Sequence, residues 1–208
     1  IVADNLCGID SVYKGSMGTS VAKVFDYTVG STGNNEKALI RQNIKYKTIH
    51  IHPGSHAGYY PGSTSIAMKL LFDPKTEKIY GAQAVGMDGV DKRIDVLATA
   101  IRGHVKVTDL KDLELSYAPP FSSAKDPVNM LGFVAENMIN NLVRVVEWKD
   151  VHDLIEAKSF ILDVRDEIEF QLGSIPTAVN IPLPELRNRL ETLPKDQKIY
   201  IKYFNELK

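Results

Sequence analysis

Hydrophobic and polar residues alternate along several short stretches in the first two thirds of the chain, a pattern typical of half-buried β-strands. Strands are expected over residues 20–29, 45–51, 66–72 and 78–85, and the glycines between Gly30 and Gly33 are expected to end the first. The turn-forming run from Asp73 to Glu77 predicts that the last two strands form an antiparallel hairpin.

Apolar residues at helical spacing, next to capping residues, predict helices between and after these strands. Asn34 or Asn35 can cap a first helix that runs to about residue 42. Asp88 can cap a second helix that Gly103 ends, and Asp126 can start a third that runs to about residue 142. An antiparallel sheet with helices packed against it is an α+β fold.

The pattern changes after about residue 142, where we place a domain boundary. Short helices are expected over 148–157, 167–172 and 184–193, and short strands over 159–164, 179–181 and 198–203. Strands that alternate with helices predict a parallel sheet and an α/β unit. Asp163 and Arg165, at the carboxyl end of one of these strands, are expected to fix the neighbouring loops.

Composition narrows the class of protein. With 208 residues, 44% of them hydrophobic and 25% charged, the chain is typical of a globular protein. A net charge of −1 without a basic stripe predicts neither a nucleic-acid partner nor an anionic membrane surface. No apolar run is long enough to span a bilayer, and the single Cys7 cannot form an internal disulfide, so we expect a cytoplasmic protein.

Both ends of the sequence predict that it is a piece of a longer protein. It opens on Ile1 without an initiator methionine, and it stops soon after an apolar run with no closing element.

Three histidines are the first candidates for a metal site. His50 and His52 are expected on one face of a strand, and His56 follows four residues later. No cysteine or carboxylate nearby supplies a fourth ligand, so packed or hydrogen-bonded histidines are expected rather than a zinc site.

Tyrosines in stiff loops are the stronger candidates for a functional site. Tyr117 precedes Pro119 and Pro120, which fix extended backbone, while Tyr59 and Tyr60 lie in a loop rich in glycine and proline. A tyrosine hydroxyl has an ordinary pKa near 10, so it stays protonated at neutral pH and can donate a hydrogen bond or a proton to a developing anion. The alternative is that each tyrosine covers an edge of the core, and the sequence does not establish that the hydroxyls converge.

Three segments carry a resemblance to a known family: residues 56–61 (HAGYYP), 89–96 (GVDKRIDV) and 117–129 (YAPPFSSAKDPVN). They resemble the C-terminal dimerisation domain of the coenzyme A disulfide reductases, which are FAD- and NAD(P)H-dependent pyridine nucleotide-disulfide oxidoreductases. The resemblance implies a remnant of the preceding FAD-binding domain at 1–8, an α+β dimerisation domain at 9–141, and a truncated α/β rhodanese-like domain at 142–208.

The resemblance also implies a chemistry that this chain holds only in part. In the family, NAD(P)H reduces FAD, and the flavin passes electrons to an active-site cysteine that cycles as a mixed disulfide with coenzyme A. These parts lie upstream, so no cofactor is expected in this chain, and Cys7 is not the matching cysteine. The family further implies a homodimer in which Tyr59 and Tyr117, with Tyr60 as the fallback for the first, reach the partner's active site. There they would hydrogen-bond to the leaving thiolate or protonate it.

The rhodanese resemblance has three departures. Ser174 stands where that family often has histidine, Thr177 where it often has glycine, and Tyr203 near the expected catalytic cysteine. Sulfur transfer is therefore not expected. The leading hypothesis is an enzyme fragment that is inactive alone; a noncatalytic dimerisation or interaction module, or less favourably a rhodanese sulfurtransferase fragment, are the alternatives.

Overall fold

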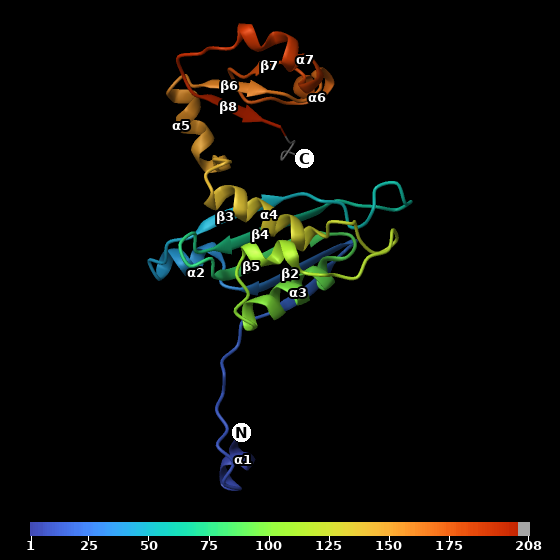
Figure 1. Ribbon diagram of the computed structural model, residues 1–208, viewed down its shortest axis with the longest axis vertical. Coiled ribbons are helices and arrows are strands. Elements are labelled where there is room, and N and C mark those ends of the chain that lie inside the picture. The colour runs from blue at the N-terminus through green and yellow to red at the C-terminus, as the bar shows by residue number, and fades with distance from the viewer. Residues whose placement is uncertain (204–208) are drawn as a thin grey trace. The chain divides into compact units, whose positions relative to one another are not determined.

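The computed structural model describes residues 1–203, and the last five residues of the predicted rhodanese-like domain lie outside them. The chain divides into two compact units, 1–144 and 145–208 (Figure 1). Each unit has its own sheet and its own hydrophobic core.

The first unit is built on a five-stranded sheet with the order β1-β2-β5-β4-β3. Each neighbouring pair of strands is antiparallel. The strands are β1 (Ser20–Val24), β2 (Tyr27–Gly33), β3 (Lys47–Ile51), β4 (Ile66–Phe72) and β5 (Ile79–Gly86). The pairing of β4 with β5 confirms the predicted antiparallel hairpin.

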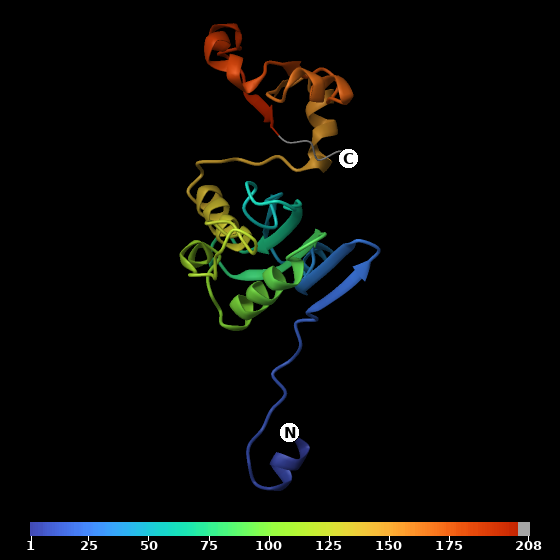
Figure 2. The ribbon, with the colours of Figure 1, turned by 90° about the vertical axis from the view of Figure 1, so that its right-hand side faces the viewer.

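Two long helices pack against this sheet, which confirms the predicted α+β fold. The helical segments are α1 (Val2–Leu6), α2 (Glu36–Arg41), α3 (Val90–Arg102), η1 (Thr108–Asp112, a 3-10 helix) and α4 (Pro127–Ile139). The helix α3 packs on β2 and β5, whereas α4 contacts η1 and β3 (Figure 2).

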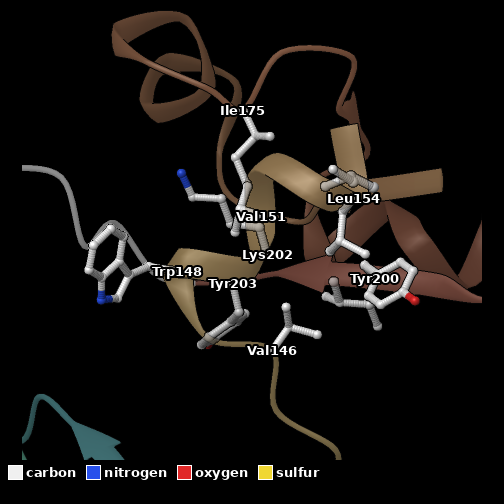
Figure 3. Close-up of a pocket in the computed structure, with 10 residues that line it drawn as sticks. Val146, Trp148, Val151, Leu154, Ile175, Tyr200, Lys202 and Tyr203 are labelled. Carbon is white, nitrogen blue, oxygen red and sulfur yellow. The ribbon is translucent and has the colours of Figure 1, made fainter. Parts of the chain in front are cut away.

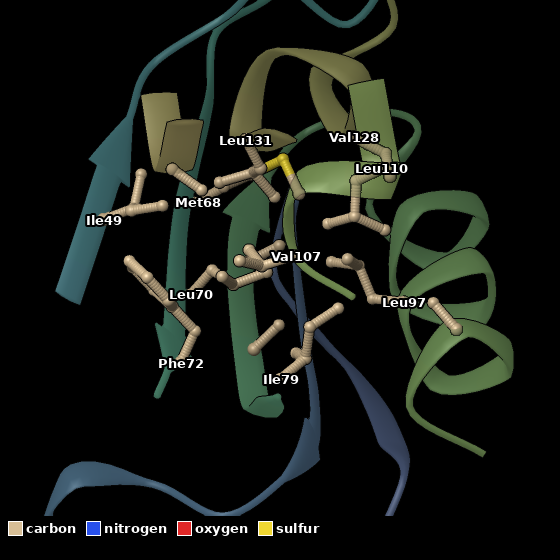
Figure 4. Close-up of a cluster of buried hydrophobic side chains, with 14 of the residues drawn as sticks. Ile49, Met68, Leu70, Phe72, Ile79, Leu97, Val107, Leu110, Val128 and Leu131 are labelled. Atoms are coloured by element: carbon tan, nitrogen blue, oxygen red, sulfur yellow. The ribbon is translucent and has the colours of Figure 1, made fainter. Parts of the chain in front are cut away.

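The core of the first unit lies between the sheet and these helices. Alternate residues of β4, among them Met68, Leu70 and Phe72, are buried in one cluster with Leu97 of α3 and Leu131 of α4 (Figure 4). Burying each large apolar side chain contributes about 1.5–3 kcal/mol relative to leaving it exposed. Burial of these side chains is therefore what holds the helices on the sheet.

The prediction of one strand over residues 20–29 is wrong. The chain reverses at Phe25 and Asp26, so that β1 and β2 form a hairpin. Phe25 makes the turn with a φ of 53°, a conformation that usually requires glycine or asparagine, so the sequence carries no turn signal there. The strand β2 also continues through Gly30, where a Cβ atom would lie 2.7 Å from Cγ1 of Ile94. This glycine allows α3 to approach the sheet and does not end the strand.

The predicted cap of α3 is also wrong. The N-cap residue is Gly89, which has a φ of 70°, and no side chain caps the helix there, so Asp88 has no such role. The other two caps are confirmed: the Asn35 side chain accepts from the backbone N–H of Ala38, and Asp126 caps α4 in a capping box.

The second unit contains a three-stranded sheet with the order β7-β6-β8, in which both pairings are parallel. Its strands are β6 (Phe160–Asp163), β7 (Val179–Asn180) and β8 (Ile199–Lys202). Its helical segments are η2 (Trp148–Asp150), α5 (Val151–Glu156), α6 (Glu167–Leu172), α7 (Leu183–Leu186) and η3 (Arg187–Thr192). The small core includes Leu162, Val164 and Ile181. This arrangement confirms the predicted α/β unit.

Within residues 1–203, no helix has the length and apolar character needed to cross a bilayer.

Candidate functional site

Two of the three candidate tyrosines meet at the surface of the first unit. Tyr59 lies in the loop between β3 and β4, and Tyr117 lies in the loop between η1 and α4. Their hydroxyl oxygens are 3.0 Å apart and hydrogen-bonded. The two residues are 77% and 49% exposed, respectively, so the pair is open to a ligand or to another molecule. We call Tyr59 and Tyr117 the tyrosine pair.

The contact with Tyr59 also changes the acidity of Tyr117. The hydrogen bond that Tyr117 shares with Tyr59 and, to a smaller extent, partial desolvation raise the pKa of Tyr117 above the ordinary value of a tyrosine. At neutral pH the Tyr117 hydroxyl is therefore protonated and can act as a hydrogen-bond donor.

Counting hydrogens shows what the tyrosine pair can offer. Two hydroxyls carry two hydrogens, and the bond within the pair uses one of them. The hydroxyl that accepts this bond keeps its own hydrogen for an outside acceptor, and it becomes a better donor because hydrogen bonds in a chain polarise one another. The pair is thus a suitable donor for an anion that approaches from solvent.

Tyr60 does not join the tyrosine pair. Its ring packs edge-on against the ring of His56, with 5.8 Å between the centroids. Its backbone N–H donates to the carbonyl of Ala57 at 2.9 Å, which closes a turn. In this turn the side chains of Tyr59 and Tyr60 contact different partners. The structure therefore brings Tyr59, and not the fallback residue Tyr60, to Tyr117.

The loop of Tyr117 is held by local hydrogen bonds that the sequence explains. The N–H groups of Phe121 and Ser122 both donate to the carbonyl of Ala118, at 2.9 and 3.1 Å. Further along, the Asp126 carboxylate accepts from the N–H of Val128 at 3.0 Å at the start of α4. A turn and a helix cap thus fix both ends of the segment that follows Tyr117.

A buried arginine that the sequence reading did not single out as a site residue lies beneath the two loops. The guanidinium of Arg93, on α3, donates to the backbone carbonyl of Ser55, to the Ser122 hydroxyl and to the Asp126 carboxylate. The sequence did contain a signal, because Arg93 falls on the buried stripe of α3 between Val90 and Ile94. A charged residue on an apolar stripe is rarely buried without a partner.

The three histidines do not form a metal site with one another. His56 is buried, with its Nδ1 atom 3.2 Å from the carbonyl oxygen of Ala57, while His50 is an exposed residue of β3. Within residues 1–203, no group of three or more histidine, cysteine or acidic side chains is placed to hold a metal ion.

In the second unit, Asp163 and Arg165 form a buried ion pair at the end of β6, with Nη2 of the arginine 2.6 Å from Oδ2 of the aspartate. Arg165 also donates to the carbonyl of Gly173 at 2.8 Å, and the Asn180 side chain donates to the carbonyls of both paired residues. These bonds confirm that the pair fixes the neighbouring loops. Burial alone would raise the pKa of Asp163, but hydrogen bonds from Arg165 and its positive charge together lower this pKa below the ordinary value.

A pocket of about 610 Å³ lies in the second unit, lined by residues of η2, α5, β6 and β8 together with Val146, Ile175 and Tyr203 (Figure 3). Among the described residues that line it, none is a cysteine or a serine, so they offer neither a thiol nor a serine hydroxyl as nucleophile. Of the other two departures from the rhodanese pattern, Ser174 is exposed and Thr177 has a φ of 72°. That conformation favours glycine, the residue that the rhodanese pattern often has there.

Comparison with known proteins identifies the family of the first unit. Residues 19–127 match the pyridine nucleotide-disulphide oxidoreductase dimerisation domain. The chain belongs to this family. Residues 147–202 match the rhodanese-like domain, and this match begins close to the start of the second unit.

Three relatives of this chain are informative. A coenzyme A disulfide reductase of Staphylococcus haemolyticus (strain JCSC1435) is 40% identical over 139 residues, which are 66% of this chain and 31% of that protein. The crystal structure of reduced Bacillus anthracis CoADR-RHD matches with a TM-score of 0.94 and 54% identity, covering 97% of this chain and 36% of that one. A NAD-dependent persulfide reductase from A. fulgidus matches with a TM-score of 0.85 and 36% identity, with the same shares covered. The chain thus spans about a third of the length of these relatives.

In the second unit, the two described connections that lead from a parallel strand to a helix lack the glycine-rich turn of a dinucleotide-binding site. Such a site needs a glycine-rich turn between a parallel strand and a helix, so that the backbone can approach the phosphates. The connections from β6 to α6 (164–166) and from β7 to α7 (181–182) contain no glycine.

Proposed function

We propose that this chain is the dimerisation and rhodanese-like portion of an FAD- and NAD(P)H-dependent coenzyme A disulfide reductase, which acts as a cytoplasmic homodimer. In this proposal, residues 1–8 belong to the preceding FAD-binding domain, 9–141 to the dimerisation domain and 142–208 to the rhodanese-like domain. The 40% identity to a coenzyme A disulfide reductase, and the 54% identity to the Bacillus anthracis protein over nearly the whole chain, support it. The flavin, the nicotinamide and the active-site cysteine would belong to the part upstream, so this chain is inactive alone.

The observation that carries the proposal is the hydrogen bond between Tyr59 and Tyr117. The two residues come from two different segments that resemble the reductases, and they are far apart in the sequence. An exposed pair of hydroxyls has little value for the stability of its own domain, because exposed polar contacts exchange readily with water. We therefore infer that the tyrosine pair binds a molecule outside the first unit.

We assign the pair to the departing thiolate of coenzyme A in the partner subunit's active site. The cofactors would supply the reducing equivalents, and this chain would supply a hydrogen-bond donor. Because a thiol has an ordinary pKa of about 8.5 and a tyrosine one of about 10, the proton remains mainly on the tyrosine. The raised pKa of Tyr117 widens that gap. The tyrosine pair therefore stabilises the thiolate by donating a hydrogen bond, and it does not transfer a proton at equilibrium.

The test is Tyr117→Phe in the full-length enzyme. A hydrogen bond to a charged group is worth about 1.5–3 kcal/mol, so we expect disulfide turnover to fall by a factor on the order of 10–100. Reduction of the flavin by NAD(P)H should stay at the wild-type rate in rapid-mixing experiments. Tyr60→Phe, beside the pair but not in it, is the matched control and should change neither rate. Unchanged disulfide turnover in the Tyr117 variant would refute the assigned role.

Sulfur transfer is not part of this proposal. A rhodanese needs a cysteine in the loop that follows the strand corresponding to β8. The single cysteine of the chain is Cys7, near α1.

A further inference from the structure

The two tyrosine loops are joined to each other by a buried cluster beneath the tyrosine pair. The direct link is a backbone hydrogen bond from the N–H of Ala57 to the carbonyl of Ser122, at 3.0 Å. The indirect link is the Arg93 side chain, which is only 1% exposed and bonds to both loops from α3.

Arg93 uses all three of its guanidinium nitrogens in this cluster. Its Nη1 atom donates to the carbonyl of Gly89 at 3.1 Å. Its Nη2 atom donates to the Ser55 carbonyl at 2.9 Å, to the Ser122 hydroxyl at 3.3 Å and to Oδ2 of Asp126 at 2.9 Å. Its Nε atom lies 3.4 Å from Oδ1 of Asp126. One planar group thereby joins α3, the loop of Tyr59 and the start of α4.

The backbone at the start of α3 is shaped around this guanidinium. Gly89 has a φ of 70°, and a Cβ atom at this position would lie 2.1 Å from Nη1 of Arg93. A side chain there would therefore displace the guanidinium, besides straining the backbone. The glycine and the arginine of the 89–96 segment thus serve one arrangement.

The chain distance from this cluster to the tyrosines is short on both sides. Ser55 precedes Tyr59 by four residues, and between them Ala57 is bonded to the other loop and closes the turn with Tyr60. Ser122 follows Tyr117 by five residues, and its N–H is bonded to Ala118. Little unconstrained backbone separates the arginine from either hydroxyl.

Stability alone does not account for an ion pair in this position. Replacing a buried pair by apolar side chains of similar volume is often neutral or stabilising, because two charges must be desolvated to form it. What an apolar cluster cannot do is hold two loop backbones and a helix cap at fixed distances through directional bonds.

We propose that Arg93 is a positioning residue, which with Ser122 sets the distance and orientation of the Tyr59 and Tyr117 hydroxyls. Lysine would keep the charge at this place but has one nitrogen, which cannot reach Gly89, Ser55 and Asp126 together. The arrangement of the hydroxyls follows from the structure itself, whereas its use in catalysis rests on the proposed function.

The experiment is a titration of Tyr117 in the 208-residue chain, followed by NMR of ¹³C-labelled tyrosine rings and assigned with Tyr117→Phe. In the wild-type chain we expect the pKa of Tyr117 to lie above that of an ordinary tyrosine. In Arg93→Lys it should return toward the ordinary value, because the hydroxyls separate. Arg102→Lys is the matched control: Arg102 lies on the same helix and donates to the carbonyls of Lys14 and Gly15, away from both loops.

Ser122→Ala is the second variant, for the case in which Arg93→Lys does not fold. It removes the hydroxyl that lies 3.3 Å from Arg93 and 2.6 Å from Asp126, while the buried ion pair keeps both its partners. We expect a shift of the Tyr117 titration in the same direction. A folded Arg93→Lys or Ser122→Ala chain with the wild-type titration of Tyr117 would overturn the inference.

Failure of this inference can be told from failure of the proposed function. If only the positioning role is wrong, Arg93→Lys leaves the titration of Tyr117 unchanged, yet Tyr117→Phe still slows the full-length enzyme. If only the proposed function is wrong, Arg93→Lys shifts the titration, but Tyr117→Phe leaves turnover unchanged. If both are right, Arg93→Lys slows the enzyme and adds little to the loss already caused by Tyr117→Phe, since both changes remove the same interaction.

Discussion

Each unit of this chain contains one buried arginine–aspartate pair, and the two pairs are built in opposite ways. Arg93 and Asp126 are 33 residues apart, with side chains 1% and 3% exposed. Arg165 and Asp163 are two residues apart and equally buried. The second pair forms within a single turn of chain, whereas the first can form only after a helix and two loops have assembled.

Each pair constrains a different part of the fold. The local pair fixes the end of one strand, because its further bonds go to Gly173 and Asn180 in the same small unit. The long-range pair fixes the relation between loops that are remote in sequence, and those loops carry the tyrosine pair. A charge cluster that joins distant segments is therefore a better marker of a site than one that closes a turn.

The largest effect is expected from removing each arginine. Arg93→Met leaves Asp126 buried without its partner, which costs about 3–5 kcal/mol, and the loss should appear in the first unit only. Arg165→Met should cost a similar amount in the second unit only. Amide hydrogen exchange, resolved by residue, checks both variants. Equal loss of protection in both units from either variant would contradict the separation of the pairs.

A smaller effect is expected from acid. The pKa of Asp163 is lower in the folded chain than its ordinary value, so the folded state favours the ionised form. The stability from this group is fully present above the unfolded pKa of about 3.9 and is lost as the pH falls through the lower folded value. We expect the second unit to weaken below about pH 4 in urea titrations at stepped pH. Arg165→Met should flatten that dependence; an equally steep dependence in the variant would show that other carboxylates cause it.

The smallest effect is expected from Thr177→Gly, and it should be a gain. A left-handed conformation destabilises a residue with a side chain by about 1–2 kcal/mol, and glycine removes this strain. Glycine also loses more chain entropy on folding, which offsets about 0.5–1 kcal/mol of the gain. The free energy of unfolding of the second unit, measured by urea titration, should therefore rise by about 0.5–1 kcal/mol. Lys158→Gly, at a φ of 52° but without β-branching, is the matched control and should gain less. A loss of stability in Thr177→Gly would mean that contacts of the threonine outweigh its strain.

The same contrast between local and long-range features explains what the sequence could predict. The capping of α4 by Asp126, the hairpin of β4 and β5, and the role of Asp163 and Arg165 in fixing loops all depend on residues a few positions apart, and all were predicted. The hairpin of β1 and β2 was missed because Phe25 makes a turn that is normally made by glycine or asparagine.

The site was predictable only in its parts. Tyr59 and Tyr117 could be selected as exposed tyrosines in stiff loops, and the resemblance named them together. Their contact depends on the order of five strands and on the packing of α3, which periodicity does not determine. The role of Arg93 was missed for the same reason, since its partners are spread over the chain.

The most direct test of the central claim, that the tyrosine pair serves the partner subunit, is a mixed dimer of the full-length enzyme. One subunit carries Tyr59→Phe and Tyr117→Phe, and the other lacks the active-site cysteine. If the tyrosines act across the interface, the intact cysteine faces the intact tyrosines, and the mixed dimer should have about half the disulfide reductase activity of the wild type. If they act within their own subunit, no site is complete and the mixed dimer should have about half the low activity of the double tyrosine variant, which would contradict the claim.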